Sequence, residues 1–200
     1  YCEASVRKFD ITMGGVSSLY NFSELSPVVP DIDALSDAVG EVGYERLNVS
    51  GHNVSIDGSA QIDLGAVAKG FIADEMREYL SDNGVESAII SLGGNILTIG
   101  KRPDGESYKI GIQYPEKGSD RLAATVYAAD ISVVTSGVYE RSFTENGQLY
   151  HHILDPETGE PVRNGIASVS IIGYSSLDCD ALSTVCFVMG LQDGMELINS

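Results

Sequence analysis

The 200-residue sequence predicts an α+β fold, with a mostly antiparallel sheet and helices packed against it. Short segments in which apolar and polar residues alternate, typical of half-buried strands, follow one another with turn residues between them. Helical segments interrupt these runs only a few times, whereas a doubly wound parallel sheet needs a crossover helix between most strands. No repeat or linker divides the chain, so we expect residues 1–200 to form one domain.

Helices are predicted from caps and from apolar spacing. Asp31 can accept hydrogen bonds from the first turn of a helix that Gly40 ends. A stronger helix is expected over residues 65–80, where apolar side chains recur at helical spacing. A last helical region is expected over residues 178–189, before Gly190. The apolar stripe of the second helix consists of Val67, Phe71, Ile72, Met76, Tyr79 and Leu80.

Strands are predicted wherever alternation is bounded by turn residues. Asp57-Gly58 is the expected hairpin turn for the first pair, and Asn146-Gly147 is the expected tip of a later hairpin. The predicted strands cover residues 47–49, 54–56, 87–92, 96–99, 108–113, 123–127, 131–135, 150–154 and 168–172.

The charge of the chain limits its ligands. It carries 12 Lys and Arg against 29 Asp and Glu, a net charge of −17. Nucleic-acid binding relies on clustered Lys and Arg, so we expect no nucleic-acid partner. A phosphorylated ligand would need a divalent cation, backbone N–H groups or a well-placed Lys. The three cysteines fit no zinc signature, and we expect Cys179 and Cys186 to pack as small apolar residues.

A first motif reads Ile-Asp-Leu-Gly-Ala-Val-Ala-Lys-Gly over residues 62–70. Asp63 ends a strand, small residues follow, and a helix begins at once. The unpaired N–H groups of a helix start attract anions, and Lys69 lies one turn further on, where its ammonium can reach a phosphate. The alternative interpretation is a capped helix with small packing residues and a solvated Lys.

A second motif places His151 and His152 just before an Asp155-Pro156 turn. A histidine there is a candidate general base, and Asp155 is near enough in sequence to orient one imidazole. Alternation along a strand directs the two histidines to opposite faces, so only one can face a given site. The alternative is a surface hairpin with polar turn residues.

A third motif reads Asp-Cys-Asp-Ala-Leu-Ser-Thr over residues 178–184. Asp180 and Thr184 are four residues apart, so on a helix they share a face. A carboxylate and a hydroxyl are oxygen ligands of the kind Mg²⁺ takes, alongside waters and substrate phosphates. The alternative is an N-cap, with Asp178 or Asp180 bonding the first turn of the helix.

Together these motifs resemble the FAD:protein FMN transferase (ApbE) family. Six blocks match the family's pattern in order and span nearly the whole chain. The resemblance implies an ApbE-like, T-fold-related architecture. It also implies that the chain lacks the family's additional N-terminal segment, and Tyr20 stands where the family usually has Trp. The blocks are FDITMGGVSSLYNF, IDLGAVAKGFIAD, SLGGNI, TSGVYERSF, HHILDPETGEPV and DCDALSTVCFVMG.

The resemblance also implies roles for individual residues. His152 is expected to be the catalytic base, held in place by Asp155. The expected Mg²⁺ ligands are the Ala66 carbonyl and the side chains of Asp180 and Thr184, with Ser183 as a nearby candidate. The expected flavin and FAD contacts are Phe9, Asp10, Asp63, Lys69 and Leu154.

The function implied by the resemblance is Mg²⁺-dependent transfer of FMN from FAD to a Thr or Ser hydroxyl of an acceptor protein, with release of AMP. Two alternatives are Mg²⁺-dependent hydrolysis of FAD to FMN and AMP, and a flavin-binding protein without catalysis. The expected partners are FAD and an acceptor, typically a membrane redox subunit. The expected location is outside the cytoplasm, with membrane anchoring through a segment absent from this chain.

Overall fold

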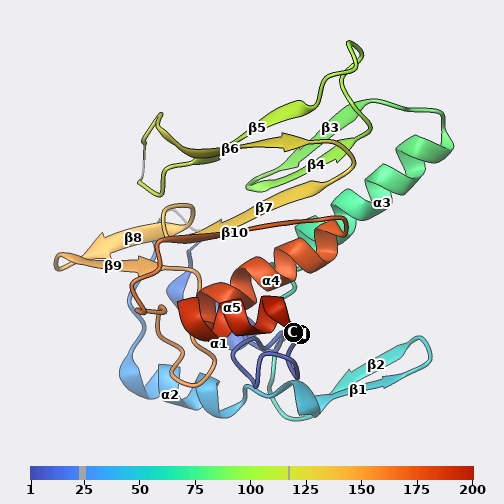
Figure 1. Cartoon of the computed structure of the whole chain (residues 1–200). Coiled ribbons are helices and arrows are strands. Elements are labelled where there is room, and N and C mark those ends of the chain that lie inside the picture. The colour runs from blue at the N-terminus through green and yellow to red at the C-terminus, as the bar shows by residue number, and fades with distance from the viewer. Residues whose placement is uncertain (23–25, 117) are drawn as a thin grey trace. The chain divides into compact units, whose positions relative to one another are not determined.

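The computed structural model describes residues 1–22, 26–116 and 118–200 (Figure 1). By contacts, the chain divides into two compact units, and neither is a continuous stretch of sequence. Unit 1 contains Tyr1–Leu64, Val138–Gly165 and Val188–Ser200, and unit 2 contains Gly65–Gly137 and Ile166–Phe187. That residues 1–200 form one domain stays a prediction. Within the described residues, no helix is both long and apolar enough to cross a bilayer.

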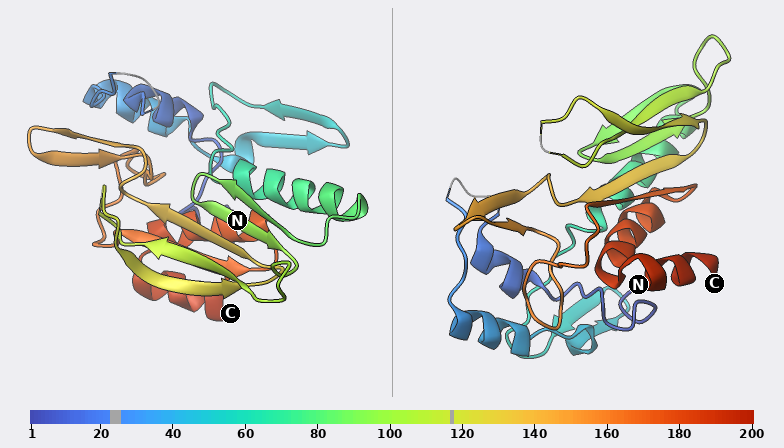
Figure 2. Two further views of the ribbon diagram at one scale, coloured as in Figure 1. Left: turned by 90° about the horizontal axis from the view of Figure 1, so that it is seen from above. Right: turned by 60° about the vertical axis from the view of Figure 1, so that its left-hand side comes forward.

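Unit 2 is organised by a four-stranded antiparallel sheet in the order β10-β7-β4-β3 (Figures 1 and 2). A separate hairpin, β5–β6, belongs to the same unit, and α3 packs on β3 and β4. The elements are α3 (Ala68–Asp82), β3 (Ala88–Leu92), β4 (Asn95–Ile99), β5 (Tyr108–Gln113), β6 (Leu122–Ala128), β7 (Ser132–Gly137), β10 (Ser168–Gly173) and α4 (Ser176–Met189), which extends two residues beyond the unit.

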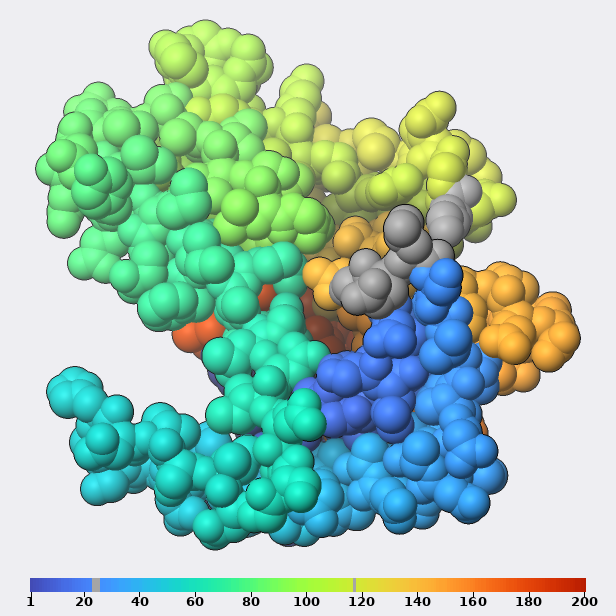
Figure 3. All heavy atoms as spheres, turned by 180° about the vertical axis from the view of Figure 1, so that it is seen from behind, coloured from blue at the N-terminus to red at the C-terminus, as the bar shows by residue number. Residues whose placement is uncertain are grey.

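Unit 1 combines short helices with two hairpins. Its core is formed by buried side chains from α1 and the residue before it, from α2 and from the segment after β9: Met13, Val16, Tyr20, Leu35 and Leu154. The β1–β2 hairpin carries mainly exposed side chains, and its atoms form part of the surface in Figure 3. The elements are α1 (Gly14–Tyr20), α2 (Ile32–Gly40), the 3-10 turn η1 (Tyr44–Arg46), β1 (Leu47–Ser50), β2 (Asn53–Ile56), β8 (Ser142–Glu145), β9 (Gln148–His151) and α5 (Leu191–Asn199).

The predicted α+β class with mostly antiparallel pairing is confirmed. All pairings between named strands in the described residues are antiparallel.

Two local predictions are also confirmed. Asp31 caps α2 by accepting from the N–H groups of Asp33 and Ala34. Cys179 is buried, and burial raises the pKa of its thiol to about 11, so it packs as an uncharged side chain.

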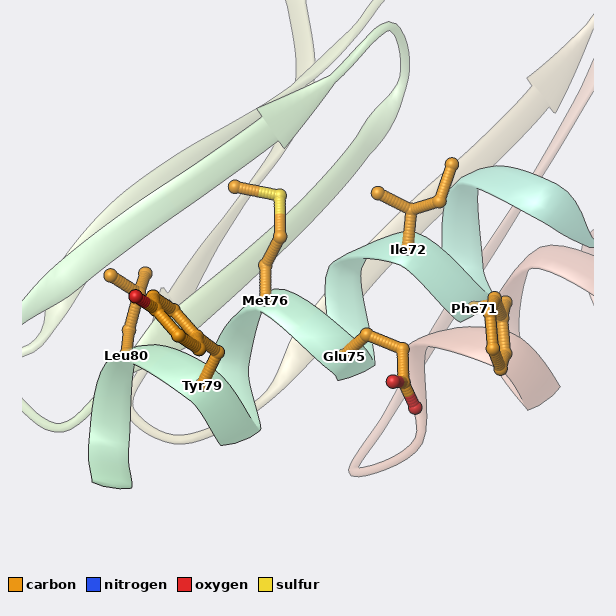
Figure 4. Close-up of a pocket in the computed structure, with 6 residues that line it drawn as sticks. All are labelled: Phe71, Ile72, Glu75, Met76, Tyr79 and Leu80. Atoms are coloured by element: carbon orange, nitrogen blue, oxygen red, sulfur yellow. The ribbon is translucent and has the colours of Figure 1, made fainter. Parts of the chain in front are cut away.

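Two local predictions were wrong. The first hairpin turns at Gly51-His52, where Ser50 pairs with Asn53, and Asp57-Gly58 lies beyond its second strand. On α3, the buried residues are the small Gly70 and Ala73, because this helix packs by close backbone approach. Most of the predicted apolar stripe is instead exposed by 40% or more and lines a shallow apolar pocket (Figure 4): Phe71, Ile72, Met76 and Tyr79, with Glu75 and Leu80.

Candidate active site

The N-terminal turns of α3 and α4 are in direct contact in unit 2. A Cβ atom at Gly70 would lie 2.4 Å from the Ser176 carbonyl oxygen and 2.6 Å from the Leu177 Cα. Both distances are far below a van der Waals contact, so no larger residue fits between the two backbones. Gly70 therefore sets how closely the two helices approach.

Asp74 of α3 caps the start of α4. Its carboxylate accepts from the N–H groups of Ser176 at 3.1 Å and Leu177 at 2.9 Å. Arg77 pairs with Asp74 at 2.8 Å and donates to the Tyr174 carbonyl at 2.7 Å. These bonds satisfy N–H groups that a helix start leaves without intrahelical partners.

Asp180 of α4 makes the reciprocal contact with the start of α3. Its carboxylate accepts from the Gly70 N–H at 2.9 Å, and the residue is only 2% exposed. The alternative that Asp180 caps its own helix is therefore wrong. Ser175, the residue before α4, provides a local cap, since its hydroxyl accepts from the Asp178 N–H at 3.1 Å.

Lys69 supplies the positive charge beside this buried carboxylate. Its Nζ lies 3.0 Å from Asp180 Oδ1 and 3.3 Å from Oδ2, and it donates to the Gly65 carbonyl at 3.2 Å. The alternative of a merely solvated Lys is therefore wrong. A buried charge needs such a partner, because burial alone strongly disfavours the ionised form.

Three hydroxyl groups form hydrogen bonds with one another between α4 and β7. Thr184 Oγ1 is 3.2 Å from Ser136 Oγ, and Ser136 Oγ is 2.7 Å from Ser183 Oγ. Ser183 also donates to the Asp180 carbonyl at 2.9 Å. These bonds connect Thr184 to Ser136 and, through Ser183, to the backbone carbonyl of Asp180. Sequence reasoning assigned Ser136 no role, because it lies on a distant strand.

These groups fit a divalent cation by their chemistry. Within the part of the chain that the structure describes, no three His, Cys, Asp or Glu side chains gather as a metal site. Among the described residues, the Asp180 carboxylate shares the Lys69 ammonium with the Gly65 carbonyl, and the Thr184 hydroxyl lies one turn along the same helix. Mg²⁺ characteristically takes one or two carboxylates, several waters and substrate phosphates. The oxygens of Asp180 and Gly65 already hold a positive charge, the Lys69 ammonium.

Asp63 lies in unit 1, next to α1. Its N–H donates to the Ile11 carbonyl at 2.7 Å, and its carboxylate accepts from Ser17 Oγ at 2.9 Å. The neighbouring Gly14 N–H donates to the Gln61 carbonyl at 2.8 Å. Asp63 is exposed, so a ligand can reach its carboxylate.

Phe9 and Asp10 have structural contacts in unit 1. Phe9 is 6% exposed and meets Tyr1 edge-on, with ring centroids 6.3 Å apart. The Asp10 carboxylate accepts from the N–H of Thr12 at 2.8 Å, from the Thr12 hydroxyl at 2.6 Å and from the Tyr44 N–H at 2.9 Å. A flavin contact of these two residues stays a prediction.

The two adjacent histidines differ in burial. His151 is 3% exposed, and its Nε2 lies 3.0 Å from the Val162 carbonyl. Because a carbonyl only accepts, Nε2 carries the hydrogen of this bond. Burial lowers the pKa of His151, against the smaller opposing effect of this hydrogen bond. His152 is only partly buried, and its backbone N–H donates to the Arg141 carbonyl at 3.1 Å.

Asp155 stabilises the turn that follows the histidines. Its carboxylate accepts from the Glu157 N–H at 2.8 Å and lies 3.4 Å from Lys8 Nζ, and its carbonyl accepts from the Gly159 N–H at 2.7 Å. Among the described residues, neither partner of this carboxylate is a histidine. Leu154 is 8% exposed and belongs to the core of unit 1, so its contact with flavin stays a prediction.

Lowering the pH should destabilise the protein through His151. The pKa of His151 in the folded state lies below the usual 6.5, so the unfolded chain binds the proton more tightly. The stability that neutral His151 contributes is therefore complete above pH 6.5 and is lost as the pH falls through its folded pKa, at no more than about 1.4 kcal/mol per pH unit. Urea unfolding between about pH 8 and about pH 5 measures the slope. An equal slope in His151→Gln would refute this assignment.

Comparison with known proteins identifies the family. A model of the ApbE family matches residues 1–200. A relative from Treponema pallidum, named FAD:protein FMN transferase, is 37% identical over 214 residues, which cover 99% of this chain and 59% of the relative. A Klebsiella pneumoniae protein of the same name is 43% identical over 134 residues, 67% of this chain and 40% of the relative. The chain therefore belongs to the ApbE family, and it spans about three fifths or less of these relatives.

Solved structures agree with this assignment. The ApbE protein of Thermotoga maritima superimposes with a TM-score of 0.90 at 32% identity, covering 99% of this chain and 65% of that one. The flavin transferase ApbE of Vibrio cholerae gives a TM-score of 0.84 at 31% identity, with 98% and 63% coverage. The predicted ApbE-like architecture is thereby confirmed.

Proposed function

We propose that this chain transfers FMN from FAD to a Thr or Ser hydroxyl of an acceptor protein and releases AMP. The proposal is supported by the family match over residues 1–200 and by relatives named FAD:protein FMN transferase. It is carried by one observation, the buried Asp180 carboxylate with the Lys69 ammonium at the start of α3. That arrangement suits a pyrophosphate, because it combines a cation site with a helix N-terminus.

The reaction forms a phosphoester bond to the acceptor and breaks the phosphoanhydride bond of FAD. The acceptor oxygen attacks the FMN-side phosphorus of FAD, the pyrophosphate bond breaks, and AMP leaves with the electron pair. Asp180, Thr184 and the Ala66 carbonyl would hold Mg²⁺. The bound ion would offset the negative charge of the pyrophosphate and of the leaving phosphate. Lys69 would bind a phosphate oxygen directly. In a chain of net charge −17, these local positive charges offset a field that otherwise repels FAD.

The proton of the attacking hydroxyl needs a base, and we assign that role to His152. The buried His151 donates Nε2–H to the Val162 carbonyl, so a structural role suits it better. Asp155 would act as a positioning residue by stabilising the turn after His152. Asp63 would contact FAD through its exposed carboxylate, with Phe9, Asp10 and Leu154 nearer the flavin. The acceptor we propose is a membrane redox subunit outside the cytoplasm.

Incubation with FAD and MgCl₂, with and without a Thr- and Ser-containing peptide library, tests the function. Chromatography of the flavins should show FAD consumed and AMP formed only when peptides are present. FMN and AMP formed equally without peptides would make the chain an FAD pyrophosphatase instead. If FAD binds but stays intact in both reactions, the chain is a flavin-binding protein without catalysis.

Replacement of His152 by Ala should slow transfer by about 10²- to 10⁴-fold, because the reacting hydroxyl loses its base. The dissociation constant for FAD should change little, since proton transfer contributes nothing to ground-state binding. Single-turnover kinetics and FAD titration separate the two effects. The matched control is His52→Ala, in the exposed Gly51-His52 turn. Transfer that survives in His152→Ala but is lost in His151→Ala, with the fold intact, would assign the base to His151.

A further inference from the structure

The Lys69 ammonium contacts the Asp180 carboxylate, which is also the charged group that the proposed metal ion would need. It contacts both Asp180 oxygens and the Gly65 carbonyl, at 3.0 to 3.3 Å. Asp180 Oδ2 also accepts the Gly70 N–H, which leaves Oδ1 as the oxygen most available to a cation. A metal on Oδ1 would therefore compete with Lys69 for the same oxygen.

The two partners differ in their freedom to move. The Asp180 side chain is 3% exposed and lies on a helix that Gly70 holds against α3. The Lys69 side chain is 36% exposed on a flexible four-carbon stem. Two cations at contact distance from one carboxylate repel each other strongly in a partly buried site. When a metal binds, Lys69 is the group that can leave.

We propose that Lys69 is an internal counter-cation, which a divalent metal displaces from Asp180 and thereby frees to bind a phosphate of the ligand. This inference rests on the proposed function, because it takes Asp180 as a metal ligand. Before the metal binds, the Lys69 ammonium balances the negative charge of the buried Asp180 carboxylate and so maintains the contact between α3 and α4. Metal and FAD then bind with positive coupling, and each strengthens the binding of the other by the same factor.

Titration with MnCl₂ alone, followed by calorimetry without FAD, tests the competition. Lys69→Met removes the competing ammonium, so it should bind Mn²⁺ roughly tenfold or more tightly than the wild type. Lys101→Met is the matched control, since it removes an equal charge from an exposed position of unit 2, and should stay within about twofold. If Lys69→Met does not fold, Lys69→Gln replaces it in the same titration, because its uncharged amide can still donate a hydrogen bond to Asp180.

A second measurement uses the unmodified protein. Reductive methylation followed by mass spectrometry should label Lys69 poorly without metal and several-fold faster with saturating MnCl₂, while Lys101 labels equally in both. Equal or weaker Mn²⁺ affinity in both Lys69 variants, or Lys69 labelling that ignores the metal, would overturn the counter-cation role and leave the proposed function standing. Absence of saturable Mn²⁺ binding in every protein would overturn the metal site as well.

Discussion

Asp180→Asn is expected to lower the rate of FMN transfer by on the order of 10³-fold and to abolish its dependence on Mg²⁺. The amide oxygen can still accept the Gly70 N–H, so the cap of α3 persists. The negative charge that attracts a divalent cation is gone, and Lys69 loses its ion pair. Initial rates across a MgCl₂ series, with calorimetric Mn²⁺ titration beside them, measure both effects.

Asp178→Asn is the control for this substitution, because it removes the same charge from an exposed position of the same helix. It should retain nearly normal transfer and metal binding. Asp180→Asn should remain folded, with a loss of about 1–3 kcal/mol in the free energy of unfolding. Metal-dependent transfer at a near-normal rate in Asp180→Asn would remove Asp180 from the metal site.

Gly70→Ala is expected to lower the free energy of unfolding by about 2–3 kcal/mol, although alanine is the better helix former. The new Cβ would meet the Ser176 carbonyl at 2.4 Å, and this neighbour is backbone, which cannot rotate away as a side chain can. The two helices must therefore separate, which weakens the reciprocal caps made by Asp74 and Asp180. Urea unfolding measures the change.

Gly15→Ala provides the matched control in α1. An added Cβ there meets nothing within 4 Å, so the free energy of unfolding should stay unchanged or rise by up to about 1 kcal/mol. Equal effects of the two substitutions would mean that helix propensity, and not the contact between α3 and α4, governs stability at Gly70.

Features determined by neighbouring residues were predictable. The strand over residues 108–113 matches β5, because alternation and turn residues are local signals. Asn146-Gly147 adopts positive φ angles of 51° and 79°, as expected for a tight hairpin turn. Helix α1 was not predicted, since it begins with two glycines and has no side-chain cap. Its stability comes from tertiary burial of Val16 and Tyr20.

The candidate site was predictable only in part, for the same reason. Helical spacing placed Asp180 and Thr184 on one face without any tertiary information. The Lys69 and Asp180 pair is separated by 111 residues, and periodicity carries no signal across such a distance. The role of Ser136 could likewise not be predicted from the sequence, because its contact with Thr184 depends on how β7 packs beside α4. The small residues of the motif over residues 62–70 indicated close packing, and Gly70 does lie in close contact with the backbone at the start of α4.

The central claim is covalent flavin transfer, and tandem mass spectrometry of acceptor peptides tests it most directly. Peptides incubated with the protein, FAD and MgCl₂ should carry an added FMN on a Thr or Ser side chain, and the same peptides incubated with Asp180→Asn should not. Peptides that remain unmodified while the wild-type protein consumes FAD would contradict the account.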